Sequence, residues 1–410
     1  MTASQTVTGQ FGVMAEDATL KTQKLQSILL LQGPRERYAL IHNQPIPSLR
    51  DEEVLVRTAV IGLNPIDWKS PDFNFGIPQF PFISGRELVG HVSQSHPRSR
   101  FQVGDRVIVI STDYRDPRKA AYQEFVAALS CNVVKLPAQV TSAQGAALGV
   151  AFVTSAIALG SCFGLNFGEV LDGPDLRSIV ESISVDRIPR DVRDETLSSI
   201  AGHERALKGD WVAIWGGSAT SAYLSIQLAR LAGLKVAVVV DQARHGLWLS
   251  NDSHARPDLL IDNSDPNRAV SILQSTIGDK LYFGIDTTGR ENATFLLRAL
   301  QRSSGADQTP SPPATPPSHY ERRAHLIGLT GLPKTENPLN VKMHSVPLKL
   351  FHEISEVGTA LTQWLERLLQ SGKLRPPRIL GNHAGLEDVN NALDRMRNGE
   401  IRGGKLVVTV

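Results

Sequence analysis

The sequence predicts an α/β protein with two domains, a β-rich barrel-like domain and a doubly wound parallel-sheet domain inserted into it. Three observations predict this fold class. Short apolar segments separated by Gly and Pro occupy the first part of the chain, and Val-rich segments alternate with amphipathic ones in the middle. The length of 410 residues also suits two domains, at roughly 150 residues per domain.

The first domain is predicted to begin with β structure over residues 24–62, where Glu53 to Val60 alternates apolar and polar side chains. Further short strands are expected at Leu88–Val92, Arg106–Ile110 and Glu124–Val126. Short strands at this close spacing, with turn residues between them, favour a small antiparallel barrel. The segment 143–159 is rich in Ala, Leu and Val and predicts one or two helices.

The second domain shows a repeated strand–helix pattern that begins at Trp211. A strand at Trp211–Trp215 is followed by a glycine turn, a helix over 219–231 and a Val-rich strand at Lys235–Val240. A strand without polar alternation is typical of a parallel sheet that is buried on both faces. The pattern continues with expected strands and helices at Asp258–Asp262, Pro266–Ile277, Leu281–Asp286 and Glu291–Gln301.

These patterns place the domain borders. We expect the barrel-like domain to comprise residues 21–160 and 347–410, and the doubly wound domain residues 161–346. Residues 1–20 mix polar and small side chains and are predicted to form a disordered tail. In the C-terminal part, helices over 353–370 and 386–398 precede a final strand over 405–410. That strand is expected to return to the first domain and close it.

Two insertions interrupt the second domain. The first, near 168–208, is charged and has no clear period. The second, near 303–318, holds five prolines among Ser, Thr and Gly, and we expect an exposed mobile loop there.

Composition excludes several function classes. The chain has 43 Lys plus Arg and 41 Asp plus Glu, a balance that predicts no nucleic-acid partner and no anionic membrane surface. Its 2 cysteines cannot form a disulfide framework, which favours a reducing compartment. No apolar run reaches the roughly 18 residues of a membrane span, and the first residues lack a signal peptide. A cytoplasmic location is therefore predicted.

A glycine turn at Gly216, Gly217 and Ser218 separates the first strand of the second domain from its helix. A dinucleotide pyrophosphate binds at such a place, on backbone N–H groups at a helix N-terminus. The complete G-x-G-x-x-G pattern is absent, so an ordinary strand-to-helix turn is the alternative. The predicted cofactor-binding stretch continues through the next three residues, Ala219, Thr220 and Ser221.

Asp241 ends the second Val-rich strand, 25 residues after Gly216. An acidic residue there usually accepts hydrogen bonds from the ribose hydroxyls of NAD. Arg244 and His245 follow it, however, and cations at this place suit the 2′-phosphate of NADP. We expect NADPH, while Asp241 keeps NADH open and a solvated surface charge is the alternative for Arg244.

Several ordered motifs resemble the zinc-free, quinone oxidoreductase-like branch of the medium-chain dehydrogenase/reductase superfamily. The resemblance covers about residues 25–410 outside the insertions and implies a GroES-like barrel domain, a Rossmann domain and a cofactor cleft between them. The stretch Trp215–Ser221 is most similar to fungal trans-acting enoyl reductases, which serve polyketide synthases. The other matching segments are Asn64–Lys69, Gly85–Gly90, Val103–Val107, Lys135–Ala138, Ala146–Gly149 and Gly403–Val408.

One departure concerns metal. Zinc-dependent members of the superfamily carry a His where this chain has Arg86, and they also have a catalytic Cys near Asn64 and a four-Cys lobe that this chain lacks. A catalytic zinc needs three protein ligands around one point. Cys131 and Cys162 stand alone in apolar sequence and are interpreted as packed small hydrophobes. The sequence therefore predicts no metal.

The resemblance also implies which side chains contact the nicotinamide. Lys69 and Thr154 are the candidate catalytic residues, and Lys69 is expected to bind the ribose or stabilise an enolate oxygen. Asp67 is expected to orient Lys69. The alternatives are a surface lysine and a threonine hydroxyl bonded to its own helix. The remaining cofactor-binding candidates are Ile66, Trp68, Gly403 and Gly404.

The function implied by the resemblance is hydride transfer from NADPH to an activated C=C bond of an enoyl thioester, enone or quinone, in fungal secondary metabolism. Water is the expected proton source. A zinc-independent carbonyl or alcohol oxidoreductase and an inactive NADPH-binding sensor or scaffold are the alternatives. The expected partners are a small-molecule or carrier-bound substrate and a polyketide synthase, and the chain is expected to be a monomer or dimer.

Overall fold

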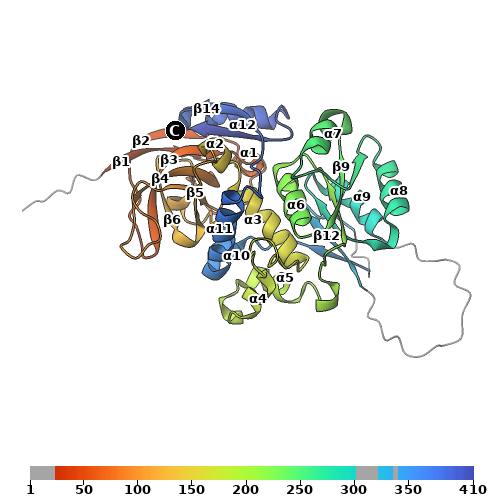
Figure 1. Cartoon of the computed structure of the whole chain (residues 1–410). Coiled ribbons are helices and arrows are strands. Elements are labelled where there is room, and N and C mark those ends of the chain that lie inside the picture. The colour runs from red at the N-terminus through yellow and green to blue at the C-terminus, as the bar shows by residue number, and fades with distance from the viewer. Residues whose placement is uncertain (1–23, 302–321, 336–339) are drawn as a thin grey trace, which may run out of the picture.

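The computed structural model describes residues 24–301, 322–335 and 340–410, which form two large sheets, a separate two-stranded sheet, and helices around them (Figure 1). The predicted tail at 1–20 and the predicted loop near 303–318 lie outside the described residues. The two large sheets correspond to the two predicted domains.

The barrel-like domain is built on a 7-stranded sheet in the order β14-β15-β3-β4-β5-β7, with β6 paired to β3. Neighbouring strands are antiparallel except for the parallel pair β14–β15. The final strand β15 pairs with β3, so the prediction that the chain returns to close its first domain is confirmed. The strands, with the separate hairpin β1–β2, are Leu25–Leu30, Ala39–Pro45, Glu53–Gly62, Glu87–Gln94, Arg106–Ile110, Phe125–Leu129, Val133–Lys135, Ile379–Ala384 and Lys405–Thr409, named β1 to β7, β14 and β15.

The nucleotide-type domain has a 6-stranded, fully parallel sheet in the order β10-β9-β8-β11-β12-β13. Helix α6 lies on the side that faces the barrel-like domain, and α8 and α9 cover the other side (Figure 1). The strands β8 to β13 are Trp211–Trp215, Lys235–Val240, Leu259–Asp262, Leu281–Asp286, Ala324–Gly328 and Val341–His344. The helices α6 to α9 are Thr220–Leu231, Gln242–Asn251, Pro266–Thr276 and Arg290–Leu300.

The first insertion contains structure that its sequence does not predict. It folds into short helices, including α4 at Leu176–Glu181 and α5 at Arg193–Ser198. Each is shorter than two helical turns, so hydrophobic periodicity has no room to develop. The helix α3 at Gly149–Ile157 continues as a π-helical turn, η3, at Ala158–Cys162, and the predicted domain border at residue 160 falls inside this turn.

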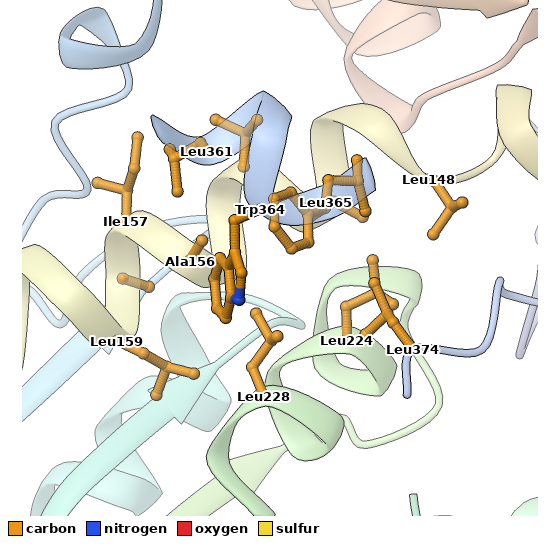
Figure 2. Close-up of a cluster of buried hydrophobic side chains, with 14 of the residues drawn as sticks. Leu148, Ala156, Ile157, Leu159, Leu224, Leu228, Leu361, Trp364, Leu365 and Leu374 are labelled. Atoms are coloured by element: carbon orange, nitrogen blue, oxygen red, sulfur yellow. The ribbon is translucent and has the colours of Figure 1, made fainter. Parts of the chain in front are cut away.

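Helix α11, at Ser355–Gln370, packs the parts together. Trp364 on α11 lies among apolar side chains of α3, η3 and α6 (Figure 2). Its indole Nε1 donates to the carbonyl of Val170 in the insertion at 3.0 Å. The sequence position of α11 assigns it to the barrel-like domain, but the helix also packs against the nucleotide-type domain and the insertion. The other helices of more than one turn are α1 at Pro65–Phe73, α2 at Ser142–Ala146, α10 at Lys349–Glu353 and α12 at Val389–Arg397.

Candidate functional site

The glycine turn lies at the carboxyl end of β8, directly before α6. Gly216 has φ +85°, and a Cβ there would lie 2.3 Å from Cγ2 of Thr288. A Cβ on Gly217 would lie 2.1 Å from Cγ1 of Val238. Neighbouring side chains, Thr288 after β11 and Val238 on β9, already require glycine at both positions. The two glycines are therefore explained by packing alone, without the close approach of a phosphate to the backbone.

The N-terminus of α6 has the properties of an anion site. The N–H groups of Gly216 and Gly217 both bond to the carbonyl of Val239, and the first helical bond runs from the N–H of Tyr223 to Ala219. Among the described residues, no side chain caps this helix. Three successive backbone N–H groups at Thr220 to Ala222 thus precede the first helical bond, which is the arrangement that binds phosphate groups.

A pocket next to this N-terminus is shared by both domains. The nucleotide-type domain contributes Ser218, Thr220, Tyr223 and Trp248, and the barrel-like domain contributes Pro377, Arg378, Gly403 and Gly404. Four of the predicted cofactor-binding residues therefore lie together in one pocket, two from each domain, although the two pairs are far apart in the sequence.

Asp241 has a structural task. Its carboxylate caps α7 by accepting from the N–H of Arg244 at 3.0 Å. A capping interaction of this kind stabilises a helix by about 0.5–2 kcal/mol and explains the acidic residue without a ribose. The side chain of Arg244 is exposed, whereas His245 is buried beside it. The guanidinium of Arg244 is therefore accessible to solvent.

Two further arginines surround His245, and the sequence reasoning missed both. Burial lowers the pKa of His245, and the positive charges of Arg244, Arg378 and Arg402 lower it further, against the opposing effect of Asp241. All three arginine side chains are exposed. Among the described residues, no carboxylate pairs with any of them. Arg402 directly precedes the Gly403–Gly404 turn, which is the only local signal that its sequence position offers.

Lys69 lies on α1 with its ammonium 5.6 Å from the ring centroid of Trp68. Within the described part of the chain, no carboxylate lies within ion-pairing distance of this ammonium. Ile66 and Trp68 are half-buried on the same helix. The structure thus leaves Lys69 available to a ligand, and its contact with a cofactor stays a prediction.

The hydroxyl of Thr154 is bonded to its own helix, which is the alternative to a contact with the nicotinamide. Its hydroxyl donates to the carbonyl of Val150 at 2.7 Å. The next residue, Ser155, connects α3 to the first turn of α6, because its hydroxyl donates to the carbonyl of Ser221 at 2.9 Å. The segment that carries Thr154 is therefore held against the start of α6, and the role of its hydroxyl stays a prediction.

Asp67 is directed into the barrel-like domain. It is 1% exposed, and its carboxylate accepts from the N–H of Asn64 at 2.8 Å. Burial raises the pKa of Asp67 to about 6, against the lowering effect of the positive charge of Arg86. The carboxylate closes the first turn of α1, and no described contact joins it to Lys69, so the structure does not support the expectation that Asp67 orients Lys69.

Asn64, Glu87 and Lys405 form a buried polar cluster that the sequence reasoning did not identify. The ammonium of Lys405 pairs with Glu87 and donates to Oδ1 of Asn64 at 3.0 Å. Asn64 donates to Glu87 at 2.9 Å, and the second oxygen of Glu87 accepts from the N–H of Val150 at 2.9 Å. The cluster joins the barrel sheet to the helix that carries Thr154. The side chain of Asn64 thus bonds to residues far from it in the sequence, and not only within the local turn at Asn64–Pro65.

Arg86 occupies the place where zinc-dependent relatives carry a ligand histidine. It is 7% exposed, and its guanidinium lies 4.7 Å from the ring centroid of Tyr114. In the described residues, one group of His, Cys and carboxylate atoms is close enough to hold a metal, and it includes neither Arg86 nor its neighbours. The prediction of a zinc-free catalytic site remains a prediction.

Comparison with known proteins agrees with the fold. The alcohol dehydrogenase GroES-like domain matches residues 50–139. A trans-enoyl reductase of Aspergillus sclerotiorum is 26% identical over 381 residues, which cover 91% of this chain and 97% of that protein. A mycobacterial protein solved in complex with NADPH has a TM-score of 0.65 at 18% identity, covering 94% of this chain and 100% of that one. A quinone oxidoreductase from Coxiella burnetii has a TM-score of 0.63 at 17% identity, with 94% and 100% covered.

These similarities confirm the predicted pairing of a GroES-like domain with a Rossmann domain. In the described residues, no helix is both long and apolar enough to span a membrane.

Proposed function

We propose that the chain is a member of the medium-chain dehydrogenase/reductase superfamily, in its quinone oxidoreductase-like branch, and that it uses NADPH to reduce an activated C=C bond. Similarity over nearly the whole chain to trans-enoyl reductases confirms the predicted class, an NAD(P)H-dependent oxidoreductase. The acceptor and the preference for NADPH are the parts that we propose.

The observation that carries the proposal is the pairing of an uncapped helix N-terminus with three exposed arginines. The backbone N–H groups of Thr220 to Ala222 would hold the pyrophosphate. Arg244, Arg378 and Arg402 would hold the additional 2′-phosphate that distinguishes NADPH from NADH. The carboxylate of Asp241, which would otherwise repel that phosphate, is engaged as a helix cap.

NADPH supplies the hydride when bound. The ammonium of Lys69 would then stabilise the negative charge that grows on the substrate oxygen as hydride reaches the β-carbon. The buried guanidinium of Arg86 is a second cation on the barrel-like side. Water supplies the proton that completes the reduced product. The buried cluster of Asn64, Glu87 and Lys405 would keep α1 and α3 in register with each other.

We further propose an enoyl thioester on a carrier as the preferred acceptor, with a polyketide synthase as the partner that presents it. The support is the similarity of Trp215–Ser221 to fungal trans-acting enoyl reductases, together with the similarity of more than 90% of the chain to trans-enoyl reductases. A free enone or quinone is the second acceptor class, supported by the likeness to quinone oxidoreductases.

The test is steady-state oxidation of NADPH and NADH by purified protein with an enoyl thioester, an enone, a quinone and an aldehyde. We expect turnover with NADPH and the thioester to exceed all other combinations. Turnover with the aldehyde alone would replace the proposal by a carbonyl reductase. Tight NADPH binding without turnover on any acceptor would favour a sensor or scaffold.

A further inference from the structure

Three side chains with metal-binding chemistry meet at a place that the proposed reaction does not use. Cys162 ends η3, Glu195 lies on α5 of the insertion, and His344 ends β13 at the edge of the parallel sheet. One ligand atom from each of the three lies within 4.8 Å of the other two. Nδ1 of His344 lies 2.7 Å from Oε1 of Glu195. Three segments that are far apart in the sequence therefore converge on one point.

The ligand set suits a borderline divalent cation. Thiolate, imidazole and carboxylate are the three ligand types that zinc takes in proteins, at about 2.0–2.3 Å. Tetrahedral coordination at these lengths separates ligand atoms by roughly 3.3–3.8 Å, so the distance within each pair would change by about 1.5 Å or less. The side chains of Cys162 and His344 are fully buried, and that of Glu195 is 16% exposed, which leaves access from solvent on one side.

A second layer of residues fixes the orientation of His344. Its Nε2 lies 2.9 Å from Nδ1 of His325, and the far nitrogen of His325 is a buried atom without a hydrogen-bond partner, 3.9 Å from Glu204. Glu204 is in turn held by Arg323 at 2.6 Å. Metal-binding histidines generally donate their second ring N–H to an acceptor that fixes the orientation of the ring, and Nδ1 of His325 is the available acceptor here. In the metal-free chain Nδ1–H of His344 donates to Glu195. When the ion binds, the ring proton of His344 resides on Nε2, which donates to Nδ1 of His325, and the lone pair of Nδ1 is then free for the ion.

We propose that Cys162, Glu195 and His344 form a binding site for one Zn²⁺ ion, with water as the fourth ligand. Binding releases the thiol proton of Cys162 to the buffer, and the thiolate and carboxylate together neutralise the charge of the ion. The site lies eight residues beyond Thr154 on the same continuous helix, at about 12 Å along its axis. The ion attaches the insertion to the parallel sheet and takes no part in hydride transfer.

The experiment uses the full chain, stripped of metal with a chelator and kept reduced, and titrates it with Co²⁺ and then Zn²⁺. We expect one Co²⁺ per chain, a thiolate-to-cobalt charge-transfer band, and displacement of that band by one equivalent of Zn²⁺. Added Zn²⁺ should also raise the melting temperature, because it binds the folded chain. No nicotinamide or acceptor is present, so failure here is independent of the proposed reduction.

Variants decide whether the band belongs to this site. Cys162→Ser should abolish the charge-transfer band, whereas Cys131→Ser, which changes the other cysteine, should retain it. Glu195→Gln tests a partly exposed ligand in case Cys162→Ser does not fold, and it should weaken Zn²⁺ binding at least tenfold. His325→Leu should weaken binding 10–100-fold, roughly the effect of removing a supporting partner. Absence of Co²⁺ binding by the wild type, or a band that survives in Cys162→Ser, overturns the proposal.

Discussion

The interdomain cleft and the interior of the barrel-like domain both concentrate charge, but they use it differently. At the cleft, Arg378 lines the shared pocket, and Arg244 and Arg402 lie near His245. All three arginines are exposed and have no carboxylate partner among the described residues, and α6 begins without a side-chain cap. In the interior, Lys405 and Glu87 are almost fully buried, and they bond to each other and to their neighbours. Open polar groups in a shared pocket indicate a ligand, whereas closed ones indicate a structural support.

This comparison predicts that charge removal affects stability in one region and ligand affinity in the other. The largest effect is expected for Lys405→Met. It leaves the carboxylate of Glu87 buried without its counter-charge, and breaking a buried pair in this way costs about 3–5 kcal/mol. Urea unfolding measures the loss. The double variant Lys405→Met with Glu87→Gln should recover part of it, and a loss well below about 1 kcal/mol would show that the pair is not buried.

Lys69 on α1 tests whether a cation without a carboxylate partner among the described residues acts in the proposed chemistry. If its ammonium stabilises charge that develops in the transition state, Lys69→Ala should lower turnover by about 10²–10³-fold with little loss of stability. Lys69→Arg should restore only part, because guanidinium is larger and planar. Steady-state kinetics and a separate NADPH titration distinguish this outcome from ribose binding, which would change affinity alone. Unchanged turnover and unchanged binding would remove Lys69 from the site.

The buried side chain of His352 provides a test through the pH dependence of stability. Burial lowers its pKa to about 4, and its ring bonds to the hydroxyl of Thr112 at 2.8 Å. The unfolded chain takes up a proton near pH 6.5 and the folded chain only near pH 4, so this residue destabilises the fold as pH falls between these values. His352→Gln should remove a loss of about 2–3 kcal/mol between pH 7 and pH 4.5. Parallel pH dependence of unfolding in wild type and variant would contradict this expectation.

The smallest effects are expected in the arginine group. Arg244→Ala and Arg378→Ala should each weaken NADPH binding by about 1–3 kcal/mol, the value of a hydrogen bond to a charged group. NADH binding and stability should stay nearly unchanged, since both side chains are exposed. Arg298→Ala, on the outer helix α9, is the matched control and should change neither NADPH binding nor NADH binding. Tighter binding of NADH than NADPH by the wild type would reverse the proposed cofactor preference.

Elements with strong local patterns were predicted well. The strands β8, β9 and β11 and the helices α6, α8 and α9 lie close to their predicted positions, because apolar periodicity and glycine turns are local signals. The helix α1 was missed, since it contains Pro71, and a proline in the interior normally argues against a helix. The strands β12 and β14 were also missed, and each has only two large apolar residues beside a His and a Gly.

By itself the sequence determined the two-domain fold, the glycine turn and the presence of cations after the second Val-rich strand. Its signals extend over a few residues, so they report helix and strand periods and turn chemistry. Only the tertiary structure decided which distant side chains meet. It placed Arg378 and Arg402 beside His245, paired Lys405 with Glu87, and joined Cys162, Glu195 and His344. Such contacts depend on how helices and sheets pack across the chain, and no local pattern specifies that packing.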